Sequence, residues 1–180
     1  MLSILKQWIR TGIVTEDSPS DLSEIQSELK RIEEMNPLAK KALSRSLLIR
    51  HLDSGSTNAE EAELLALSNP IYDIARFGID FTASPRHADV LTVSGPVTRH
   101  LKIAMEKTYN AMPHPKIVIA LGDGACKGLP FDLTYACLGK VEQFLPVDIY
   151  IPGDPPPPVR IIKGLLLCKM LLAKKGGKNG

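Results

Sequence analysis

The 180 residues are 44% hydrophobic and 23% charged, which suits one compact domain with a terminal appendage and excludes wholesale disorder. The 22 basic and 20 acidic residues leave a formal net charge of +2, and aromatic residues make up only 5%. This balance argues against nucleic acid as a partner. The three cysteines, Cys126, Cys137 and Cys168, form no CxxC or Cys/His pattern, so we expect incidental thiols rather than disulfides or a zinc site.

The first 45 residues are expected to form an N-terminal helical extension and linker. Apolar residues recur at helical spacing over 2–10, which is typical either of a helix packed on its own domain or of an anchor to a membrane surface or partner. A linker over 11–20 precedes helices predicted at 21–35 and 37–45. No secretory signal pattern and no membrane-spanning run is apparent, so we expect a soluble chain that meets the membrane mainly through its partners.

From residue 46 onward, strands and helices alternate, which predicts an α/β domain with a mostly parallel sheet and helices on both sides. The segment 46–173 forms this domain, and 174–180 is expected to be a flexible basic tail. The predicted strands are 47–52, 77–81, 89–93, 117–121 and 147–151, and the predicted helices are 58–68, a helix ending near 111, 133–144 and 159–173. In such a sheet the ligand crevice lies beyond the carboxyl ends of the strands. Four loops should therefore converge there: 53–58, 94–98, 122–131 and 152–158.

Five motifs occur in order along this domain, and together they resemble one family. The motifs are Tyr72-Asp73 with Arg76-Phe77-Gly78, Ser84-Pro85-Arg86-His87-Ala88-Asp89, Ser94-Gly95-Pro96-Val97-Thr98-Arg99, Met112-Pro113-His114-Pro115-Lys116, and Pro146-Val147-Asp148-Ile149-Tyr150-Ile151-Pro152-Gly153. The resemblance is to the 20 kDa subunit of respiratory complex I and to the small subunits of membrane-bound nickel-iron hydrogenases, and it covers about residues 46–173.

The resemblance implies a flavodoxin-like three-layer fold, a multi-subunit complex and one 4Fe-4S cluster held by four cysteines. The matching positions here hold Thr57, Glu60, Gly124 and Asp154. Iron in such clusters is held by thiolates, with occasional imidazole, so these residues do not suit it. Cys126 lies two positions past the third ligand position, but one thiolate does not hold a cluster. We therefore expect no cluster, no metal and no catalytic residue in this chain.

The residues at the first two positions suggest what replaces the ligands. Thr57-Asn58-Ala59-Glu60 has the spacing of a capping box, in which a hydroxyl and a carboxylate satisfy the backbone at a helix start. A new functional pair is the alternative. Asp154 should lie near Glu60 in the crevice, and two close carboxylates disfavour joint ionisation. Lys127, a cation or a proton are the candidates for neutralising them.

Two further features allow more than one interpretation. The stretch Gly122–Gly128 matches neither GxxxxGK[ST] nor GxGxxG, so a tight strand-to-helix turn is favoured over a phosphate loop. Lys127 beside Cys126 suggests a lowered thiol pKa, but no base is placed for catalysis. Arg86, His87 and Arg99 are interface candidates by resemblance, with Arg86 interpreted either as an anchor for a neighbouring subunit or as a simple loop charge.

These observations predict a structural and coupling subunit of a membrane-associated complex I-like, hydrogenase-related assembly that has lost the family's electron-transfer site. Its expected partners are a protein resembling the 49 kDa or hydrogenase large subunit and membrane subunits, on the cytoplasmic side of the membrane. The alternative is an electron-transferring oxidoreductase subunit, of quinone or hydrogenase type, with a 4Fe-4S cluster held by replacement or partner ligands. A third hypothesis is a flavodoxin-like module that binds a small ligand.

Overall fold

The computed structural model describes residues 27, 30, 46–130 and 134–176. Within this part the chain alternates strands with helices and short 3-10 turns. Residues 122–127 form a short helix, where the sequence predicted a loop with a tight turn. The strands are β1 (Leu47–Asp53), β2 (Ile79–Phe81), β3 (Val90–Ser94), β4 (Ile117–Leu121) and β5 (Ile149–Ile151). The helices are α4 (Ala59–Ala66), α5 (Lys102–Ala111), α6 (Gly122–Lys127) and α7 (Pro158–Gly176), with 3-10 turns η1 (Ile74–Phe77), η2 (Pro85–His87) and η3 (Val141–Gln143).

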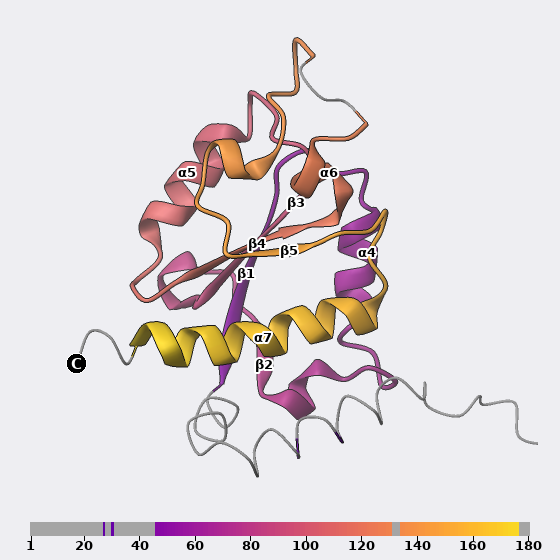
Figure 1. The fold of residues 1–180 in the computed structure, drawn as a ribbon, viewed down its shortest axis with the longest axis vertical. Coiled ribbons are helices and arrows are strands. Elements are labelled where there is room, and N and C mark those ends of the chain that lie inside the picture. The colour runs from indigo at the N-terminus through magenta and orange to yellow at the C-terminus, as the bar shows by residue number, and fades with distance from the viewer. Residues whose placement is uncertain (1–26, 28–29, 31–45, 131–133, 177–180) are drawn as a thin grey trace, which may run out of the picture.

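The five strands form one parallel sheet in the order β2-β1-β3-β4-β5. This is the flavodoxin-like strand order, and it confirms the predicted α/β fold. Helix α7 crosses one face of the sheet, while α5 lies on the other (Figure 1). Strands β3 and β4 are buried along their whole length, which explains why β4 is a continuous apolar run.

Two apolar clusters fill the space between the sheet and its helices. One joins the inward side chains of β1 and β4 to α4 and α7 and includes Ile49, Ile119 and Ile162. The other lies on the opposite face and includes Leu91 and Met105 of α5. Because alternate residues of each strand point to opposite faces, the same strands supply both clusters.

The predicted helix at 133–144 is wrong in the part of it that the structure describes, where only the three-residue turn η3 is helical. The segment instead pairs with the chain after β3. Val97 donates its N–H to the Gly139 carbonyl at 2.8 Å, and Leu138 donates to the Val97 carbonyl at 2.7 Å. Arg99 likewise donates to Ala136 at 2.9 Å. These non-local bonds use the backbone groups that a helix would need.

Smaller differences occur at element ends. Strand β2 begins two residues later than predicted because Phe77 ends the turn η1 and Gly78 follows at a positive φ of 64°. Helix α7 continues three residues past its predicted end at 173.

The predicted extension over 1–45 lies outside the described residues, apart from Ser27 and Lys30. Both are helical and exposed, in agreement with a helix over 21–35. The interpretations of 2–10 and 11–20, the helix at 37–45 and the division at residue 45 stay predictions. Among the helices that the structure describes, none is long and apolar enough to cross a membrane.

Candidate functional site at the carboxyl ends of the strands

The four predicted loops do converge beyond the carboxyl ends of the strands, and glycines allow their backbones to touch. A Cβ added at Gly55 would lie 2.4 Å from Cγ2 of Thr98, and one at Gly95 would lie 2.2 Å from the backbone nitrogen of Ser56. Asp123 and Gly153 join the other two loops, since the Asp123 N–H donates to the Gly153 carbonyl at 2.8 Å. The sheet order reverses between β1 and β3, so this is the edge where ligands bind in open α/β sheets.

A polar network at this edge is centred on Glu61 of α4. Ser56 donates its hydroxyl to Oε2 of Glu61 at 2.5 Å, and Ser94 donates to Oε1. Nε2 of His51 lies 3.1 Å from the same Oε1, and its Nδ1 lies 3.1 Å from Oγ1 of Thr92. The network therefore connects α4 to the ends of both β1 and β3.

Burial and hydrogen bonding set the charges in this network. Burial opposes ionisation of Glu61, but hydrogen bonds from Ser56, Ser94, its own backbone amide and His51 together hold the pKa of Glu61 below its ordinary value. Burial also lowers the pKa of His51, against the smaller raising effect of Glu61. At neutral pH the network therefore holds an ionised glutamate and a neutral histidine.

Sequence reasoning did not find this network, although part of the signal is present. Asp53 stands opposite Ser94, and His51 opposite Thr92, in the parallel register of β1 and β3. The register is not visible in the sequence, so only the polar residues at the two strand ends could have suggested it.

Glu60, the neighbour of Glu61, points into a different environment. Its side chain is only 3% exposed, and its Oε2 has no hydrogen-bond partner among the described residues. A Cβ added at Gly122 would lie 2.2 Å from Oε1 of Glu60, so the carboxyl group is packed against the start of α6. Burial is the largest cause of a raised pKa for Glu60, and the charges of Glu61, Asp154 and Asp53 add to it.

The capping-box interpretation of Thr57 and Glu60 is wrong. Helix α4 begins at Ala59, and its N-cap is Asn58, which has φ 69° and makes no side-chain cap hydrogen bond. Thr57 is exposed. The turn before the helix is held instead by Asp53, whose Oδ1 accepts the N–H groups of Gly55 and Ser56, each at 2.7 Å.

Gly124 is buried against the loop that follows β3. A Cβ at this position would lie 2.9 Å from Cδ of Pro96 and 3.0 Å from Cα of Gly95. The space that a longer side chain would need is therefore filled by protein. Asp154 is exposed, and its charge acts on Glu60 across the crevice, as the sequence predicted.

Lys127 was one candidate for neutralising Glu60 and Asp154, but it forms its ion pair with another carboxylate. Its Nζ lies 3.1 Å from Oδ2 of Asp123, one turn earlier in α6. The second carboxylate oxygen of Asp123 accepts the Gly153 N–H at 3.1 Å. No ion pair joins Lys127 to Glu60 or Asp154 in the described part of the chain, which leaves a proton or another cation as the candidates.

The thiol of Cys126 is protonated at neutral pH in this setting. Burial raises its pKa to about 11, so the lowered pKa suggested by Lys127 is wrong. The Sγ donates to the Ala120 carbonyl at 3.3 Å. Over residues 46–130 and 134–176, no three His, Cys, Asp or Glu side chains gather so that they could hold a metal ion.

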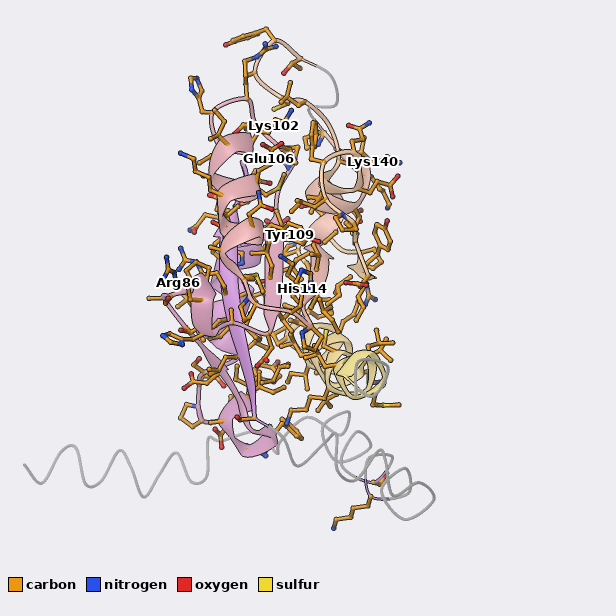
Figure 2. The ribbon with its side chains drawn as sticks, turned by 90° about the vertical axis from the view of Figure 1, so that its left-hand side faces the viewer. Arg86, Lys102, Glu106, Tyr109, His114 and Lys140 are labelled. Carbon is orange, nitrogen blue, oxygen red and sulfur yellow. The ribbon has the colours of Figure 1, made fainter. Side chains whose placement is uncertain are left out.

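The three interface candidates lie on the surface of the domain. Arg86 and His87 belong to the turn η2 and are exposed. Figure 2 shows Arg86 pointing outward at the edge of the molecule. Arg99 is also exposed, and its Nε donates to the Tyr135 carbonyl at 3.1 Å. Their roles in subunit contact stay predictions.

The strand order and the crevice at its reversal define a flavodoxin-like α/β protein whose loops meet in a glycine-lined contact. The chain belongs to the family described as NADH ubiquinone oxidoreductase, 20 Kd subunit, which matches residues 58–168. This agrees with the resemblance drawn from the five motifs.

Individual relatives support the same assignment. The chain is 39% identical over 148 residues to "Probable membrane-bound hydrogenase subunit mbhJ" of Pyrococcus furiosus, covering 82% of this chain and 89% of that one. It is 47% identical over 108 residues to one of the NADH-quinone oxidoreductase subunits of Clostridium beijerinckii, covering 59% and 64%. Among solved structures, one from the membrane-bound sulfane sulfur reductase, an archaeal respiratory membrane complex, matches with a TM-score of 0.64 and 30% identity over 78% of this chain and 77% of that chain.

Proposed function

We propose that this chain is a structural and coupling subunit of a membrane-associated assembly related to complex I and to membrane-bound hydrogenases, and that it has lost the family's 4Fe-4S site. Relatives named as subunits of a membrane-bound hydrogenase and of an NADH-quinone oxidoreductase support the first part. The chain would hold a large-subunit-like partner against membrane subunits, and it would meet the membrane through them.

The loss of the 4Fe-4S site is supported by the residues that stand at the family's ligand positions. The positions that match the family's ligands hold Thr57, Glu60, Gly124 and Asp154, and none of these supplies a thiolate or an imidazole. Carboxylate oxygens favour harder ions than the iron of a cluster. These residues therefore do not fit a 4Fe-4S cluster.

The packing at Gly124 supports the same conclusion. Pro96 and Gly95 fill the volume into which a ligand side chain from residue 124 would extend. Cys126 is the thiol nearest to residue 124 in the sequence. Its Sγ donates to the Ala120 carbonyl and its pKa is raised, so it is not a thiolate ready to bind iron.

Iron and acid-labile sulfide in the anaerobically purified native complex, normalised to this chain, test the proposal. We expect no iron assignable to this subunit and no signal from it in the EPR spectrum of the reduced complex. The matched control is Cys126→Ser. Near-stoichiometric cluster iron that disappears in this variant would overturn the proposal and favour an electron-transferring subunit with replacement ligands.

A further inference from the structure

The carboxyl group of Glu60 is buried without the partners that an ionised carboxylate needs. The side chain is 3% exposed, and Oε2 has no hydrogen-bond partner among the described residues. Oε1 lies against Gly122, where even a methyl group would collide with it. Desolvation of an ionised carboxylate is strongly unfavourable unless hydrogen bonds or an opposite charge compensate for it.

The charges that act most strongly on Glu60 are negative. Glu61 lies next to it on α4, Asp53 ends β1, and Asp154 is in the loop between β5 and α7. Each of these raises the pKa of Glu60, in addition to the larger effect of burial. Its own backbone amide acts in the opposite direction and lowers the pKa of Glu60, by less than burial raises it.

The cationic side chains on the neighbouring helices are bonded elsewhere. Lys127 of α6 is paired with Asp123, and Arg160 of α7 donates to the Pro152 carbonyl at 2.9 Å. His51 of β1 is bonded to Glu61 rather than to Glu60. No ion pair to Glu60 is found in the described part of the chain.

Glu60 and Glu61 are adjacent in sequence but have opposite surroundings. Glu61 accepts hydrogen bonds from Ser56 and Ser94 and lies 3.1 Å from His51, so its negative charge is well compensated. Glu60 has none of these donors. Pairs of carboxyl groups whose surroundings push their pKa values apart hold different protonation states at the same pH.

We propose that Glu60 is a proton-binding site: its carboxyl group carries a proton at neutral pH and occupies the crevice as a neutral acid. A metal ion is not the favoured ligand, since no three suitable side chains gather in the described part of the chain. The inference extends the proposed function, because it rests on this crevice holding no iron-sulfur cluster. A proton then neutralises the group that stands at one of the family's ligand positions.

Infrared spectroscopy of the full-length chain, labelled with ¹³C-carboxyl glutamate, tests this directly at neutral pH. We expect the carbonyl stretch of a protonated carboxyl group, shifted by the label and by transfer to D₂O. The band should be lost in Glu60→Gln and kept in Glu63→Gln, a matched change on the same helix. A spectrum without this band, or a band that persists in Glu60→Gln, would overturn the proposal.

Two further measurements keep the test decisive if Glu60→Gln fails to fold. A ¹³C NMR titration of the labelled wild-type chain should show one glutamate carboxyl that ionises at higher pH than the rest, and Asp154→Asn should move that transition to lower pH. Exchange of sodium or potassium for choline at constant ionic strength should change nothing. A resonance that responds to the metal cation instead would identify a cation site and refute proton binding.

Iron analysis of the same samples separates this inference from the proposed function. Cluster iron in the sample would refute the loss of the cluster, whatever the state of Glu60. An iron-free sample in which every glutamate is ionised at neutral pH would refute only the proton site.

Discussion

Replacing Gly122 with alanine tests whether the carboxyl group of Glu60 is packed against α6. Gly122 has φ 84°, a conformation that costs a non-glycine residue about 1–3 kcal/mol. The new methyl group would also lie 2.2 Å from Oε1 of Glu60, 2.8 Å from its Cγ and 2.9 Å from its Cδ. Overpacking of this kind costs a further 1–3 kcal/mol or so, which gives a total loss of about 2–6 kcal/mol.

The assay is urea unfolding of the full-length chain, with Gly128→Ala as the matched control. Gly128 has φ 82° and follows the other end of α6, so it tests the backbone strain without the overlap at Glu60. The double variant Gly122→Ala with Glu60→Ala should recover part of the loss, because the shorter side chain removes the overlap. Equal losses for Gly122→Ala and Gly128→Ala, with no coupling in the double variant, would refute the packing argument.

Two other predictions follow from the same crevice. The folded-state pKa of Glu60 lies above its ordinary value of 4.5, so the stability that this group contributes is complete below pH 4.5 and is lost as pH rises through the folded pKa. Glu60→Gln should remove that component from the pH dependence of urea unfolding, and an unchanged slope would contradict it. Ser94→Ala should reduce stability by about 1.5–3 kcal/mol by removing a hydrogen bond to the ionised Glu61. The loss should shrink when Glu61→Gln is already present, and strict additivity in this double-mutant cycle would show that the bond contributes nothing.

The elements that sequence analysis predicted well are those whose determinants are local. Strand β4 has five consecutive apolar residues because both of its faces are covered, and that pattern is visible in the sequence. Helix α7 begins at Pro158, the last residue in a run of prolines. The convergence of four loops followed from the topology alone.

The failures have non-local causes. The segment after Thr134 was predicted to be helical, but its backbone bonds are made with Val97 and Arg99, more than thirty residues away. The capping box failed because Asp53, four residues before Thr57, already organises the turn. The partners of Glu61 depend on the register of β1 and β3, which no local pattern encodes.

The contact between Gly124 and the loop after β3 also limits which side chains residue 124 can carry. Introducing cysteines at the four positions of the family pattern would place the Cβ of residue 124 only 2.9 Å from Pro96. The thiol there has no room unless residues 95 and 96 move as well. A cysteine at residue 124 would therefore need coordinated changes in two separate segments of the chain, and Gly124→Cys alone would reduce stability.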